Sequence, residues 1–168
     1  MSMKLRPFKS IAIFLIAACA HIHWAIAQNS TQNEPKTTCL SPKNIKAPQL
    51  YGIWQVTFTN PPAGLPVKAV MLLEKHAEFS DSLAGIVSRD GVTAKGHTAK
   101  SALAGDVEDG FVILDESSNN ISISGTWNGE LVQASCGSQI KGVWKDTSAS
   151  ASADAPDVPF TMVKRPGW

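Results

Sequence analysis

The chain is poor in aromatic residues, in cysteine and in net charge, and each shortage excludes a class of protein. Aromatic residues make up 7% of its 168 residues, and there are only one tyrosine and three cysteines. A formal net charge of +1 leaves no excess of basic side chains to neutralise phosphates, so we expect no nucleic-acid partner. With 43% apolar and 17% charged residues, the chain has the composition of one ordinary globular domain.

Long hydrophobic runs are also missing. The apolar segment 11–18 has eight residues, too few to cross a bilayer as a helix. It follows a basic stretch that contains Lys4, Arg6 and Lys9. A basic stretch before a short apolar one is typical of an export signal, so we expect a secreted or periplasmic protein.

Two cleavage sites compete for this signal. Alanines at 25 and 27 are the small residues that a signal peptidase accepts, which predicts a signal peptide over 1–27. The alternative is a lipoprotein signal over 1–18, because residues 16–18 before Cys19 are similar to a bacterial lipobox. A lipidated Cys19 would anchor the protein to the cell envelope, and this is the one membrane contact that we expect.

The remaining cysteines, Cys39 and Cys136, form an even pair in a chain that we expect to be exported. Disulfides persist in oxidising compartments, so we predict a bridge between them. It would close a loop of about 97 residues. Two free buried thiols are the alternative.

The composition changes near residue 49. Residues 28–48 are rich in Asn, Gln, Thr, Pro and Lys without apolar periodicity, which predicts a flexible tether that contributes no core. From 49 to 168 apolar and polar residues alternate with period two, which predicts strands near 50–58, 67–75, 82–89, 101–108, 111–116, 121–127, 130–136, 139–145 and 158–164. No segment is expected to be a helix.

Turn signals separate several of these strands. Asp90-Gly91, Asp109-Gly110 and Asn128-Gly129 are dipeptides that readily adopt the backbone of a two-residue hairpin turn. We therefore expect antiparallel neighbours at each.

Glycine recurs on the inward line of the predicted strands. An apolar-x-Gly-x-apolar pattern occurs at Gly52, Gly85, Gly105, Gly125 and Gly142. Glycine weakens a strand unless it permits a sharp bend or a close approach, both of which a small closed sheet requires. The sequence therefore predicts an all-β fold, a single antiparallel up-and-down meander barrel of about eight strands.

A family resemblance agrees with this fold. Gly52-x-Trp54 opening the first strand, the Trp127-Asn128-Gly129 run and a strand ending in Trp144 make residues 50–164 resemble the calycin superfamily, in particular the avidins. The resemblance implies that Trp54, Trp127 and Trp144 line a ligand pocket. The Asn and Ser that avidins place just after Trp54 are replaced by Gln55 to Phe58, so the resemblance implies the shape and not biotin binding.

One stretch is strongly acidic. No Lys or Arg occurs between Lys100 and Lys141, and the acidic residues there are Asp106, Glu108, Asp109, Asp115, Glu116 and Glu130. A cation or a basic partner could use such a face. Solvent-facing strand positions for Asp106 and Glu108, and turns for Asp109 and the pair Asp115-Glu116, are the alternative.

The sequence offers no combination of residues for catalysis, for a metal or for a cofactor. His76 and His97 have no paired ligand at a useful spacing, and no Ser, His and Asp set can be assembled. We expect a non-catalytic envelope protein whose barrel binds a small apolar or amphipathic molecule. The alternative is a barrel with a filled core, in which each Trp packs over a Gly, acting as an inhibitor or on an envelope protein partner.

Overall fold

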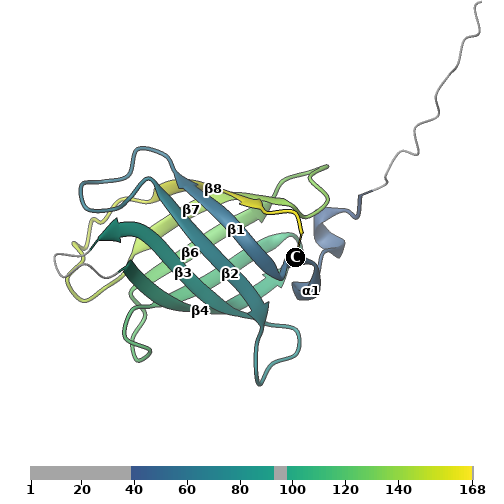
Figure 1. Cartoon of the computed structure of the whole chain (residues 1–168), viewed down its shortest axis with the longest axis horizontal. Coiled ribbons are helices and arrows are strands. Elements are labelled where there is room, and N and C mark those ends of the chain that lie inside the picture. The colour runs from purple at the N-terminus through teal and green to yellow at the C-terminus, as the bar shows by residue number, and fades with distance from the viewer. Residues whose placement is uncertain (1–38, 93–97, 168) are drawn as a thin grey trace, which may run out of the picture. The chain divides into compact units, whose positions relative to one another are not determined.

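The computed structural model describes residues 39–92 and 98–167, which form a closed barrel of eight antiparallel strands (Figure 1). Each strand pairs with the next along the chain, and the last pairs with the first. The predicted all-β fold and its up-and-down strand order are confirmed. The strands are β1 (Gly52–Phe58), β2 (Lys68–Lys75), β3 (Leu83–Val92), β4 (Thr98–Glu108), β5 (Phe111–Ser117), β6 (Gly125–Leu131), β7 (Gln139–Asp146) and β8 (Val158–Lys164).

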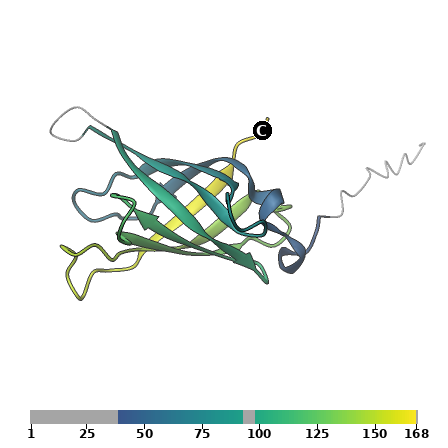
Figure 2. The same ribbon diagram turned by 90° about the horizontal axis from the view of Figure 1, so that it is seen from below.

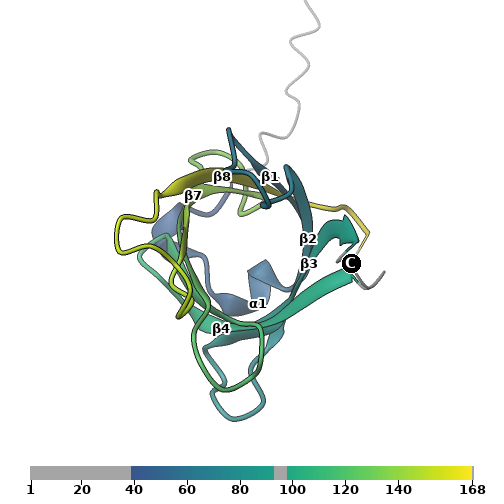
Figure 3. The ribbon, with the colours of Figure 1, turned by 90° about the vertical axis from the view of Figure 1, so that its left-hand side faces the viewer.

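Alternation within each strand sends one set of side chains into the barrel. In β1, Trp54, Val56 and Phe58 are buried, whereas Gln55 and Thr57 are exposed. Successive side chains of a strand point to opposite faces, so the inward set of eight strands makes one core. Viewed along the barrel, the strands form a closed ring (Figure 3).

The end of the barrel at which β1 begins is closed by the segment before it. This segment contains a short 3-10 helix, Pro42–Asn44, and one turn of α-helix, α1 (Ala47–Leu50). Ile45 and Ala47 are buried in the core, so the expectation that residues before 49 contribute no core is wrong for this part. Leu50 is buried as well and ends a helical turn, although no helix was expected. The β1–β2 and β7–β8 loops lie at the opposite end, which we call the open end (Figure 2).

A disulfide joins this segment to the barrel. Cys39 is bonded to Cys136, as predicted, in the loop between β6 and β7. The predicted signal segments, Cys19 and the tether up to residue 38 lie outside the described residues. Within the described ranges, no helix is long and apolar enough to cross a membrane.

One predicted hairpin turn is confirmed and two are wrong. Asp109 and Gly110 both have positive φ angles, 51° and 90°, and join Glu108 to Phe111. Asp90-Gly91 instead lies within β3. Asn128-Gly129 lies within β6, and the chain turns later, between 132 and 138.

Tertiary packing explains why Asn128-Gly129 is not a turn. Gly129 is buried and faces the core, where an added Cβ would come within 2.6 Å of the Cγ2 atom of Ile140. Glycine is therefore needed here for space inside the barrel rather than for a turn. The later turn takes its positive φ angles from Ala134, Cys136 and Gly137.

The strand predicted over 121–127 begins later than expected. Ile121 and Ile123 belong to the exposed β5–β6 loop, and the side chain of Ile121 is 90% exposed. β6 starts at Gly125. The alternation of Ile and Ser in this loop resembles that of a strand, but no core lies beneath it.

Candidate functional site

An ion pair lies inside the barrel, within a mainly apolar core. Arg89 of β3 and Glu116 of β5 are both buried, and two hydrogen bonds join them. Arg89 Nη1 donates to Oε1 of Glu116 at 2.5 Å, and Nη2 donates to Oε2 at 2.7 Å. A bidentate arrangement of this kind fixes both side chains in one geometry.

The strand alternation explains why these charges face inward. Arg89 continues the buried positions of β3 after Leu83 and Val87. Glu116 continues those of β5 after Val112 and Leu114. The expectation that Glu116 sits at a solvent-facing turn is therefore wrong.

Two tryptophans also donate hydrogen bonds to the carboxylate of Glu116. The indole nitrogens of Trp127 and Trp144 both donate to Oε2 of Glu116, at 3.0 and 3.1 Å. The guanidinium carbon of Arg89 lies 5.8 Å from the ring centroid of Trp127 and 5.2 Å from that of Trp144. These distances are within the range of a cation–π contact. Each indole therefore contacts the Arg89 guanidinium with its ring and the Glu116 carboxylate with its N–H.

Glu116 is ionised at neutral pH despite its burial. Burial raises the pKa of this carboxyl, but the hydrogen bond and the charge of Arg89 lower it, and donors on Ser101 and Trp127 lower it further. The balance holds the pKa of Glu116 below its ordinary value. Charged donors around a carboxylate favour its charged form, which is what this site provides.

One donor of the site is unsatisfied. The Nε atom of Arg89 is buried, and it has no hydrogen-bond partner in the part of the chain that the structure describes. A buried N–H without an acceptor costs about 1–3 kcal/mol. Such a group would gain by meeting an acceptor from outside the described residues.

Two phenylalanine rings pack against these tryptophans. Phe58 of β1 lies 5.5 Å from Trp127 and 6.1 Å from Trp144, between ring centroids, and Phe160 of β8 lies 5.1 Å from Trp127. Trp144 also packs over Gly125, where an added Cβ would be 2.6 Å from its Nε1 atom. Large apolar surfaces and a few fixed polar groups are the usual composition of a ligand site.

A pocket of about 410 Å³ opens beside Trp144 at the open end. The β1–β2 loop contributes Pro62 and Leu65, and the β7–β8 loop contributes Ser150 and Pro156. Trp144 is thus shared, because this residue lines the pocket while its indole N–H donates to Glu116. The pocket and the ion pair are therefore connected through one side chain.

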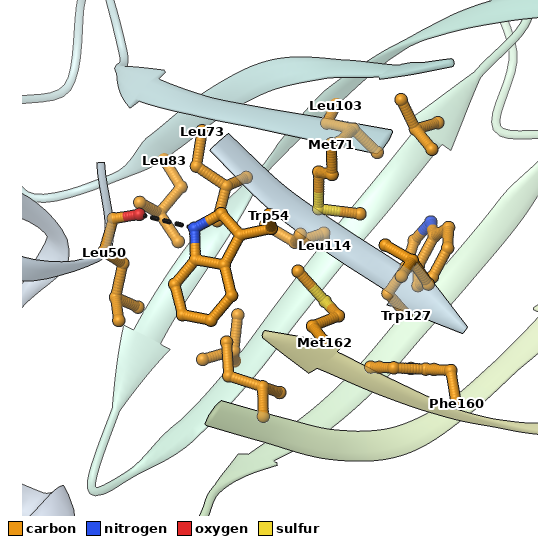
Figure 4. Close-up of a cluster of buried hydrophobic side chains, with 14 of the residues drawn as sticks. Leu50, Trp54, Met71, Leu73, Leu83, Leu103, Leu114, Trp127, Phe160 and Met162 are labelled. Carbon is orange, nitrogen blue, oxygen red and sulfur yellow. Dashed lines mark hydrogen bonds between the residues drawn. The ribbon is translucent and has the colours of Figure 1, made fainter. Parts of the chain in front are cut away.

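Trp54 lies apart from the other two predicted tryptophans. It is buried close to the closed end beside Leu50 and Leu83, and its Nε1 atom donates to the carbonyl oxygen of Leu50 at 2.8 Å (Figure 4). The ammonium of Lys164 lies 5.9 Å from the centroid of its ring and donates to the carbonyl of Gln49 at 2.6 Å. Burial lowers the pKa of Lys164. Trp54 therefore belongs to the packed core at the closed end of the barrel.

Of the three predicted pocket residues, the structure brings Trp127 and Trp144 together, with ring centroids 6.3 Å apart, and places Trp54 elsewhere. Arg89 and Glu116 were not predicted as site residues from the sequence. A signal was nevertheless present, because each continues the apolar phase of its strand and the two charges are opposite. Two such exceptions on the inward line of a barrel indicate a buried pair.

No group of three or more His, Cys, Asp or Glu side chains suited to a metal occurs among residues 39–92 and 98–167. His97 lies outside these ranges. No protein-family model matches the chain. A search of curated proteins likewise finds no match.

Proposed function

We propose that this protein is an exported, non-catalytic binding protein that takes a small amphipathic molecule at the open end of its barrel. The ligand's apolar part would lie in the pocket beside Trp144. Its polar part would approach the pair formed by Arg89 and Glu116.

The observation that supports this most directly is the fixed polar group beside the pocket. An ion pair adds little stability to a core that apolar side chains would fill as well, so its presence calls for another reason. Arg89 carries a buried N–H with no acceptor among the described residues, and Trp144 connects the pair to the pocket. A ligand with a carbonyl, hydroxyl or carboxylate oxygen would supply the missing acceptor.

The proposed location rests on two features of the chain. The basic and apolar segment before residue 19 has the order of an export signal. The disulfide between Cys39 and Cys136 is compatible with an oxidising compartment.

Native mass spectrometry of the protein purified from its own cell envelope tests the binding. We expect a complex with a small molecule that dissociates on denaturation. The Trp144→Leu variant should carry less of it, since it loses the shared side chain, whereas the control Phe79→Leu, exposed in the β2–β3 loop, should carry as much as the wild type. A wild-type protein that is always empty, or a ligand retained equally by the Trp144→Leu variant, would contradict the proposal.

A barrel with a filled core that acts on a protein partner is the second candidate. The packing around Trp54 favours it, because Leu50, Leu73 and Leu83 are fully buried with that ring. An empty barrel in the same experiment would turn the search to the outer surface.

A further inference from the structure

The outside of the barrel carries an apolar surface across β4, β5 and the β5–β6 loop. Phe111 and Ile113 of β5 are 53% and 54% exposed, and Ile123 of the loop is 49% exposed. Ile121, in the same loop, is still more exposed. Single exposed apolar residues are normal on a protein surface, but a contiguous group of large ones indicates an interaction site.

This surface is hollowed along its length. One hollow of about 300 Å³ is lined by Ala102, Ala104, Asp115 and the β5–β6 loop. A second, of about 240 Å³, is lined by Ala104, Asp115, Phe111 and Ile113. The two share Ala104 and Asp115, so they form one groove, which we call the β4–β5 groove. Its outward positions from Ala102 to Glu108 span roughly 20 Å at the rise of a strand.

The charged side chains that line the outer face of the groove are acidic. Asp106, Glu108 and Asp115 line it, and no Lys or Arg occurs in the sequence between Lys100 and Lys141. Of the six acidic residues in that interval, the structure turns only Glu116 inward to pair with Arg89. The others remain at exposed positions, and Asp106, Glu108 and Asp115 among them line the groove, which therefore combines apolar walls with acidic side chains.

We infer that the β4–β5 groove binds a polypeptide segment in which aliphatic or aromatic side chains are interleaved with Lys and Arg. The apolar side chains would fill the two hollows, and the basic ones would meet Asp106, Glu108 and Asp115. Electrostatic complementarity of this kind sets partner choice and association rate. This inference concerns a surface separate from the pocket at the open end and does not depend on a ligand there.

The same charges argue against other occupants. A second copy placed on the groove by a two-fold axis would set acidic residues against acidic residues. A membrane rich in anionic lipid would be repelled. Strand addition is also excluded along the middle of the groove, since Ala102 to Gly105 of β4 are already paired with both β3 and β5. Recognition must therefore use side chains, as a basic amphipathic segment does.

Selection from a displayed library of random peptides tests the inference without knowing the partner. Peptides of about 12 residues are long enough, because they span roughly 18 Å as a helix and more when extended. The full protein is the bait, and the enriched peptides are then synthesised and titrated. We expect them to carry excess Lys and Arg together with Ile, Leu or Phe, and to bind more weakly as salt rises.

Surface variants locate the binding. Ile113→Ser with Ile121→Ser, and separately Glu108→Gln with Asp115→Asn, should each weaken binding of these peptides about tenfold or more. The controls Val67→Ser with Val163→Ser, and Glu74→Gln, change exposed residues of the β1–β2 loop, β8 and β2, and should leave binding unchanged. All these side chains are exposed, so the variants fold as the wild type does.

Three results would overturn the inference. The library could yield no peptide that binds the wild type more tightly than the Ile113→Ser, Ile121→Ser variant. The enriched peptides could be neutral or acidic. Sedimentation could show a dimer that the Ile113→Ser, Ile121→Ser variant abolishes, or vesicles of anionic lipid could bind the wild type and not that variant, which would assign the groove to a second copy or to a membrane.

Discussion

Arg89 and Glu116, 27 residues apart in the sequence, face each other across the inside of the barrel and share two hydrogen bonds. Only β4 lies between their strands. Each charge is compensated by the other and, for the carboxylate, by two indole N–H groups. Removing one partner therefore leaves the other buried without compensation, and this asymmetry carries the first prediction.

Glu116→Gln should lower the free energy of unfolding by about 3–5 kcal/mol, because it leaves the Arg89 charge buried and unpaired. Urea denaturation followed by tryptophan fluorescence measures the loss. Asp115→Asn is the matched control, since its side chain points to solvent, and it should change stability by about 0.5 kcal/mol or less. The double variant Arg89→Met with Glu116→Leu should recover much of the loss. Equal effects of Glu116→Gln and Asp115→Asn would show that the pair is solvated.

The same carboxyl predicts a dependence of stability on pH. The folded pKa of Glu116 is below its unfolded value of about 4.3, so its ionised form stabilises the native state above that pH. This contribution is lost as the pH falls from about 4.3 through the lower, folded pKa. The stability difference between the wild type and Glu116→Gln should be constant between neutrality and about pH 5 and should shrink in more acidic solution. A difference that grows on acidification would mean that the folded pKa is raised.

Gly125→Val should overpack the core and cost about 1–3 kcal/mol. The new Cβ would meet Trp144 Nε1 at 2.6 Å, so the indole must move and its hydrogen bond to Glu116 is lost. Thermal denaturation and the near-ultraviolet circular dichroism of tryptophan report both effects. Thr126→Val, one residue on and facing away from the core, should leave the spectrum unchanged. An unchanged melting temperature for Gly125→Val would mean that residue 125 does not face the core.

Cys39→Ser with Cys136→Ser should destabilise the fold by about 4–5 kcal/mol, given the 97-residue separation of the two cysteines. Hydrogen exchange should then rise first around Ile45 and α1, which the bridge ties to the barrel. Treatment of the wild type with a reductant should give the same exchange pattern. Uniform exchange across the barrel would show that the bridge acts through the whole fold.

Much of the fold could be predicted because the barrel follows local rules. Alternation located most strands, and Asp109-Gly110 is a turn because both residues adopt the required backbone. Asn128-Gly129 has the same local signal, yet Gly129 is needed beside Ile140 in the core. Propensity alone does not distinguish a glycine chosen for its backbone from one chosen for its size.

The site was harder to predict because it is assembled from distant strands. Trp127 and Trp144 were identified, since they lie on the inward line of their strands. The adjacent acidic pair Asp115-Glu116 suggests a turn, whereas the alternation of β5 places Glu116 on the inward line after Val112 and Leu114. Trp54 shares that inward line, but its depth along the barrel separates it from the others, and depth requires the register of all eight strands.

The pairing of β1 with β8 has a consequence for how the chain reaches this structure. Thr57 of the first strand lies opposite Thr161 of the last, so the ring closes through contacts between the two ends of the domain. A chain synthesised from its N-terminus cannot form these contacts until its final strand has emerged. Until then β1 presents an open edge to any other chain nearby. Closure is therefore a late event in folding. A truncation before residue 158 would remove β8 together with the hydrogen bond from Lys164 to the carbonyl of Gln49.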